Sequence, residues 1–68
     1  MTDKNSIRAE VLEALPGMNF KVQLIDGRMV RAKLSGKMYQ NRILVSVGDL
    51  VNVVLSPDGL LGRIIRRL

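Results

Sequence analysis

The chain has 68 residues, 47% of them apolar, and 11 lysines and arginines against 6 acidic residues give it a net charge of +5. It contains no cysteine and no histidine, so disulfides, thiolate metal sites and histidine-based acid–base catalysis are excluded, and we expect a non-catalytic protein without cofactor or metal. With no apolar run long enough to span a membrane, the sequence predicts one soluble, monomeric domain over residues 1–68, with residues 1–5 as a flexible tail.

The segment that follows this tail has two interpretations. In the first, Ser6 caps a helix whose apolar stripe includes Ile7 and Val11, and Pro16 ends it. In the second, the segment is a strand with Ile7, Ala9 and Val11 on one face. The residues alone favour the helix slightly, because the strand accounts for less of the segment.

A β-hairpin is predicted next, because residues 20–24 and 30–34 both alternate between apolar and polar side chains around a turn signal, Asp26-Gly27. A two-residue turn would place Val22 opposite Arg31 and mix core and surface side chains on one face. A three-residue loop instead pairs Val22 with Val30 and puts Gly27 in the left-handed position of a bulged turn. We therefore expect the three-residue loop.

The rest of the chain predicts a helical turn and two further strands. Residues 36–41 are too few for an independent helix but fit one turn packed on a barrel. Apolar residues at alternate positions from 51 to 55 indicate a fourth strand with this set facing inward. Residues 61–66 indicate a fifth strand. At its end, Arg63 and Arg67 are expected to share a face, with Arg66 on the opposite face. Five short strands with turn signals between them indicate a small all-β barrel, closed or nearly closed, and an SH3-like barrel of similar strand count is the alternative.

The positive charge is concentrated in the predicted barrel. Residues 1–17 hold two bases and three acids, a net of −1, whereas residues 18–68 hold nine bases and three acids, a net of +6. Each of those three aspartates lies beside a glycine, where turn geometry accounts for it. The strand surfaces are therefore basic, which suits a polyanionic partner, although a merely solvated surface has the same composition.

Individual positions support nucleic-acid binding more than catalysis. Arg31 and Lys33 share one face of a strand, and Lys37 lies beside a glycine that permits close approach of a phosphate. The Gly36-Lys37 pair lacks the preceding glycine of a phosphate-binding loop. Of the two aromatic residues, Phe20 is expected in the core, and Tyr39 is expected either to stack on a base or to pack as a lid over the barrel end.

The order and spacing of Gly36-Lys37-Met38 and Gly62-Arg63-Ile64 resemble those of bacterial-type translation initiation factor 1. The resemblance implies a five-stranded OB-fold barrel with a short helical turn between strands 3 and 4, and it favours a strand for the N-terminal segment. It also implies binding at the A site of the small ribosomal subunit, to the decoding-region rRNA and a neighbouring ribosomal protein, and assistance to the other initiation factors in the cytoplasm or a plastid stroma. The predicted RNA-binding residues are Lys21, Arg31, Lys33, Gly36, Lys37, Met38, Tyr39, Asn41, Arg42, Arg63 and Arg66.

The chain departs from this family pattern within the stretch that carries it. Tyr39, Gln40 and Leu44 stand where relatives usually have bases, and Arg42 stands where they usually have an aromatic residue. The turn at residues 56–59 is also one residue shorter. Two alternatives therefore stay open: a general RNA chaperone of the cold-shock or S1 kind, and a protein-interaction barrel that docks through two apolar residues expected to face outward, Leu50 and Val54.

Overall fold

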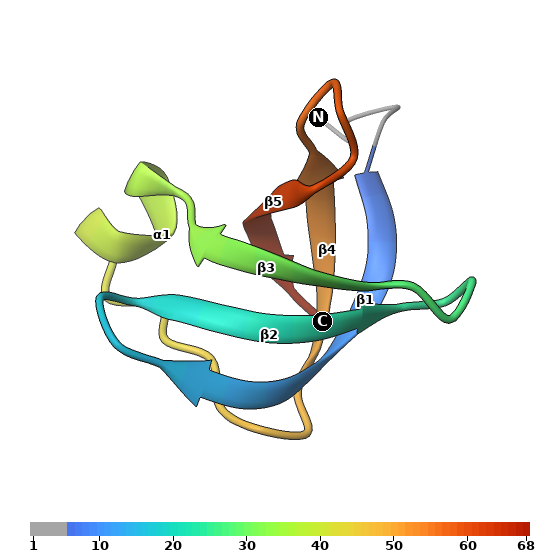
Figure 1. Ribbon diagram of the computed structural model, residues 1–68. Helices are drawn as coiled ribbons and strands as arrows, with labels where there is room; N and C mark the ends of the chain where they lie inside the picture. Colours follow the sequence, from blue (N-terminus) through green and yellow to red (C-terminus); the bar gives the residue numbers. More distant parts are fainter. Residues whose placement is uncertain (1–5) are drawn as a thin grey trace.

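Five strands close into a barrel in the order β1-β2-β3-β5-β4 in the computed structural model, which describes residues 6–68 (Figure 1). All neighbouring strands are antiparallel except β3 and β5, which are parallel. The predicted OB-fold class is confirmed, whereas the predicted tail, residues 1–5, lies outside the described residues. The elements are β1 (Ser6–Leu15), β2 (Asn19–Leu24), β3 (Met29–Leu34), α1 (Gly36–Gln40), β4 (Leu50–Leu55) and β5 (Leu61–Arg67).

The N-terminal segment is a strand because the barrel needs it to close. β1 pairs with β4 through residues 6–10 and with β2 through residues 9–15, so it joins the two ends of the sheet. Ala9 and Val11 are 1% and 0% exposed, and Ile7 packs against the core, as the strand interpretation predicts. The helix interpretation is wrong because a helix here would leave the edges of β2 and β4 without backbone partners.

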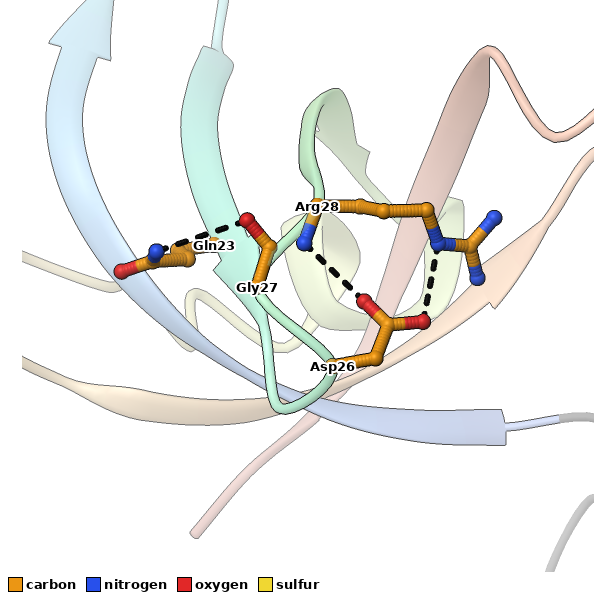
Figure 2. Close-up of polar contacts among 4 residues, drawn as sticks. All are labelled: Gln23, Asp26, Gly27 and Arg28. Carbon is orange, nitrogen blue, oxygen red and sulfur yellow. Dashed lines mark hydrogen bonds and ion pairs between the residues drawn. The ribbon is translucent and has the colours of Figure 1, made fainter.

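The hairpin of β2 and β3 has the predicted three-residue loop. Val22 pairs with Val30, and Gly27 adopts φ +93° while its N–H donates to the carbonyl of Leu24 at 2.9 Å. Asp26 fixes the loop by accepting from the backbone N–H of Arg28 at 3.0 Å and from its Nε at 2.8 Å (Figure 2). This bulged register puts every second residue of both strands into the barrel.

The interior is one apolar cluster to which all five strands and α1 contribute. Strand β5 lies tightly against β4 at Gly62, where an added Cβ would lie 2.5 Å from Cγ1 of Val53. The barrel therefore closes at this point because position 62 has no side chain. The buried residues are Ala9, Val11, Phe20, Val22, Leu24, Val30, Ala32, Leu34, Met38, Val45, Val51, Val53 and Ile64.

The short helix α1 is anchored to the barrel at its first turn. Oγ of Ser35 accepts from the backbone N–H of Met38 at 3.2 Å, and the N–H of Ser35 donates to the carbonyl of Ile64 on β5 at 2.9 Å. The side chain of Met38 is only 3% exposed and joins the core. These contacts explain how a five-residue helix, too short to be stable alone, is held in place.

A bulge in β5 changes the phase of its arginines. Val53 pairs with Ile64 and Asn52 with Arg66, so one residue of β5 has no partner and the alternation restarts. Arg66 therefore faces outward with Arg63, and the prediction that Arg63 and Arg67 share a face is wrong. Arg67 pairs with Val51, and its Nη1 donates to the carbonyl of Leu44 at 2.9 Å.

Candidate nucleic-acid interface

Four cations meet on the outer face of β2, β3 and β5. Lys21 pairs with Arg31 across the antiparallel β2–β3 ladder, and Lys33 pairs with Arg63 across the parallel β3–β5 ladder. All four are exposed, because their strand neighbours turn into the core. We call these four residues the basic surface. Sequence analysis predicted each of them, and the register brings them together.

The cations of the basic surface have no acidic partner among residues 6–68. Within residues 6–68, Asp26 and Arg28 form the one ion pair, at the tip of the β2–β3 hairpin (Figure 2). That tip lies at the opposite end of the hairpin from α1 (Figure 1). The charge of the basic surface is therefore available to an external anion.

A groove of about 670 Å³ runs beside the basic surface. Arg31 and Lys33 line it from β3, Arg63 lines it from β5, and Pro57 lines it from the turn after β4. Asn19, at the start of β2, also lines it. Sequence analysis missed Asn19, which pairs with Lys33 in the β2–β3 hairpin, and Pro57, which lies in the turn between β4 and β5.

The aspartates are held in turns, away from the strand faces. Asp26 accepts from the backbone N–H of Arg28, which lowers its pKa, and Asp58 accepts from the hydroxyl of Ser56 and the N–H of Leu60, which lower its pKa. Asp49 accepts from the N–H of Ser46 at 2.8 Å. The prediction that turn geometry accounts for these three aspartates is confirmed.

The segment from α1 to β4 adds a second group of exposed polar side chains. Lys37, Asn41 and Arg42 are exposed, and Tyr39 is 62% exposed, so it does not pack as a lid over the barrel end. An added Cβ at Gly36 would have no neighbour within 4 Å, so this side of the helix is open. The buried Met38 is the one predicted binding residue of this segment whose side chain does not reach the surface.

Arg66 lies on the outer face of β5 with Arg63, past the end of the pairing between β3 and β5. It pairs with Asn52 on β4, and Asn52 in turn pairs with Arg8 on β1. Sequence analysis predicted Arg66 as a binding residue, and the pairing of β1 with β4 brings a further arginine, Arg8, to the same face. On the β2 side, Glu13 lies opposite Lys21 and forms the acidic boundary of the basic surface.

The arrangement provides positive charge and a groove beside it. No cluster of three or more potential metal ligands occurs among residues 6–68. No helix in the same part of the chain is long and apolar enough to cross a membrane. A closed five-stranded barrel with a basic outer face and an adjacent groove defines an OB-fold protein of the nucleic-acid-binding class.

Comparison with known proteins gives a more specific assignment. Residues 1–68 match the family described as Translation initiation factor 1A / IF-1. The chain belongs to this family, so it is a translation initiation factor, and RNA binding and association with the ribosome follow from membership.

Two solved structures are similar to this chain. The solution structure of translation initiation factor 1 from the Wolbachia endosymbiont strain TRS of Brugia malayi is 33% identical, with a TM-score of 0.76, and the match covers 96% of this chain and 80% of that one. The crystal structure of YjeQ from Thermotoga maritima is 23% identical, with a TM-score of 0.76, and the match covers 93% of this chain and 22% of that one. The likeness to YjeQ is one of fold.

Proposed function

We propose that this initiation factor binds the small ribosomal subunit at the A site, contacts the decoding-region rRNA and assists the other initiation factors there. Occupying the A site would also prevent premature entry of tRNA. The observation that carries the proposal is the basic surface, in which the pairs Lys21–Arg31 and Lys33–Arg63 adjoin through β3. Its cations have no acidic partner among the described residues.

Binding would work mainly through phosphates. Side chains of Lys and Arg that neutralise RNA phosphates release counterions, so affinity falls steeply as salt rises. Recognition of unpaired bases by stacking needs exposed aromatic rings. The chain has two aromatic residues, and Phe20 is only 6% exposed, so Tyr39 alone is available for stacking. The protein is therefore suited to recognising the shape and backbone of a folded RNA.

The two alternatives have less support. A cold-shock or S1-like RNA chaperone presents surface aromatic residues on its middle strands, where this barrel has Lys21, Arg31 and Lys33. A barrel that docks a protein partner requires an exposed apolar face. Leu50 is 46% exposed, but Val54 is half-buried and pairs with the cationic Arg63. A partner held by apolar contact would also dissociate little with added salt.

Chemical probing of rRNA in small subunits, with and without the protein, tests the proposed site. We expect protection of nucleotides in the decoding region, and competition between the protein and a tRNA directed to the A site. The double variant Arg31→Ala/Lys33→Ala serves as the control, and it should lose the protection while keeping its melting temperature. Protection confined to other regions, or no effect on the tRNA, would contradict the proposal.

A further inference from the structure

The loop between β1 and β2 has two consecutive residues with a left-handed backbone, and one of them is not glycine. Gly17 has φ +75° and Met18 has φ +61°. A Cβ is unfavourable in this conformation, which glycine adopts most readily. The other non-glycine residue of this kind among residues 6–68 is Arg42, which has φ +56° and is exposed. Met18 differs, because its half-buried side chain packs against the apolar core, and this packing offsets the cost of its backbone conformation.

This loop is connected directly to the groove beside the basic surface. Asn19, the residue after Met18, lines that groove. It pairs with Leu15 on β1 and with Lys33 on β3. Its Nδ2 donates to the carbonyl of Pro16 at 2.9 Å, on the other side of the loop. The conformation of the loop therefore fixes the end of the β1–β2 ladder and the residue that lies opposite Lys33.

The methionines of the chain differ in what their oxidation would do. There are four, and Met1 lies outside the described residues. Met29 is 55% exposed on the outer face of β3, whereas Met38 is 3% exposed and shielded from solvent. Met18 combines partial exposure with packing against the core. Oxidation turns the apolar thioether into a polar sulfoxide, so at Met18 a reachable side chain would become unsuited to its apolar surroundings.

We propose that Met18 is an oxidation site that controls the proposed interface through the β1–β2 loop. Hydrogen peroxide transfers one oxygen atom to the sulfur: the O–O bond breaks, an S–O bond forms, the sulfur gives up two electrons and water leaves. The sulfoxide no longer packs well on the core, the left-handed backbone loses its compensation, and the loop loosens beside Asn19. A methionine sulfoxide reductase reverses the change, because a dithiol supplies two electrons and two protons, becomes a disulfide and releases the oxygen as water. The consequence for RNA rests on the proposed function, whereas the oxidation and the loss of stability do not depend on it.

Two leucine substitutions locate the effect. Met18→Leu removes the sulfur with little change in side-chain volume, and Met29→Leu is the matched control at an exposed position. The wild type and both variants are treated with hydrogen peroxide, and their sulfoxides are located by peptide mass spectrometry. The melting temperature and the affinity for purified small ribosomal subunits are measured before and after treatment, and again after incubation with methionine sulfoxide reductases and dithiothreitol.

We expect a sulfoxide at Met18 to lower the melting temperature of the wild type by about 4–8 °C and to weaken its binding to small subunits. Met29→Leu should respond in the same way, because its Met18 is intact. Met18→Leu should keep its melting temperature and its affinity under the same treatment. The reductases should restore both values in the wild type.

A sulfoxide at Met18 that leaves the melting temperature unchanged would overturn the inference, and so would a Met18 that stays reduced while Met29 is oxidised. An equal fall in Met18→Leu would also overturn it, because the effect would then arise at another methionine. An oxidised protein that melts earlier but binds like the untreated one would overturn the link to the interface. Failure of the untreated wild type to bind small subunits is a different result, and it contradicts the proposed function itself.

Discussion

Lys33 lies directly opposite Arg63 on the parallel strands β3 and β5, so two positive side chains leave the barrel next to each other. Like charges at opposed positions of a sheet repel, and such pairs are destabilising. The arrangement is unfavourable for the free protein and favourable for binding a phosphate backbone, because both charges reach the same strip of surface.

The first prediction follows from this pair. Lys33→Glu would replace repulsion by an ion pair with Arg63, and it should leave the free energy of unfolding unchanged or raise it by about 0.2–1 kcal/mol. The same change should weaken binding to small subunits more than Lys33→Ala does, because it adds a negative charge to the basic surface. Urea unfolding and co-sedimentation measure the two effects. Binding unaffected by the charge reversal would show that this face is not the interface.

A second prediction concerns Tyr39, which is 62% exposed. Because the ring is outside the core, Tyr39→Ala should change the melting temperature little. If the ring stacks on a base or sugar, the same variant should lose about 1–3 kcal/mol of binding free energy, and Tyr39→Phe should retain it. An alanine variant that melts earlier but binds like the wild type would rule out stacking.

A third prediction compares two glycines. Gly62→Ala should lower the free energy of unfolding by about 1–3 kcal/mol, because the new Cβ would lie 2.5 Å from Cγ1 of Val53. Gly36→Ala is the matched control, since position 36 lacks a left-handed φ and has nothing within 4 Å of an added Cβ. It should not destabilise the fold, and any loss of affinity would come from a ligand that approaches this backbone closely. Equal stability of the two variants would contradict the closure described at Gly62.

A fourth prediction concerns acid stability. Hydrogen bonds lower the pKa of Asp26 and Asp58 in the folded protein below the ordinary value of 3.8. A lowered folded pKa means that their stabilising contribution is present at neutral pH, above the unfolded pKa, and is lost as pH falls through the folded pKa. Urea midpoints should therefore stay level from pH 7 to about 5 and fall below about pH 4. Asp58→Asn should show a smaller acid-induced fall, and an identical fall would contradict the assignment.

Much of the fold was predictable because turn chemistry and alternation agree in the hairpin. Asp26-Gly27 and the alternation on both sides allow only one register that keeps Val22 and Val30 in the core, and the structure has that register. The N-terminal strand was harder to predict, because its pattern also fits a helix. Only its pairing with both β2 and β4 decides between them, and that information is not local.

The positions of the candidate site residues were predictable where they follow the regular alternation of side chains along a strand. They were not predictable where a bulge or an unusual backbone conformation interrupts it. Alternation placed Lys21, Arg31 and Lys33 outward correctly. The bulge in β5 carries no sequence signal and reversed the expected faces of Arg66 and Arg67. The left-handed backbone of Arg42 was equally invisible, since glycine is the usual signal for it.

The salt dependence of wild-type binding to small ribosomal subunits tests the central claim most directly. If each of the four residues of the basic surface neutralises one phosphate, a plot of log affinity against log salt should have a slope of about −3.6. Contacts from α1 would steepen it further. Tight binding with a slope near zero would contradict the claim that the basic surface binds RNA, and would favour an interface built from apolar contacts.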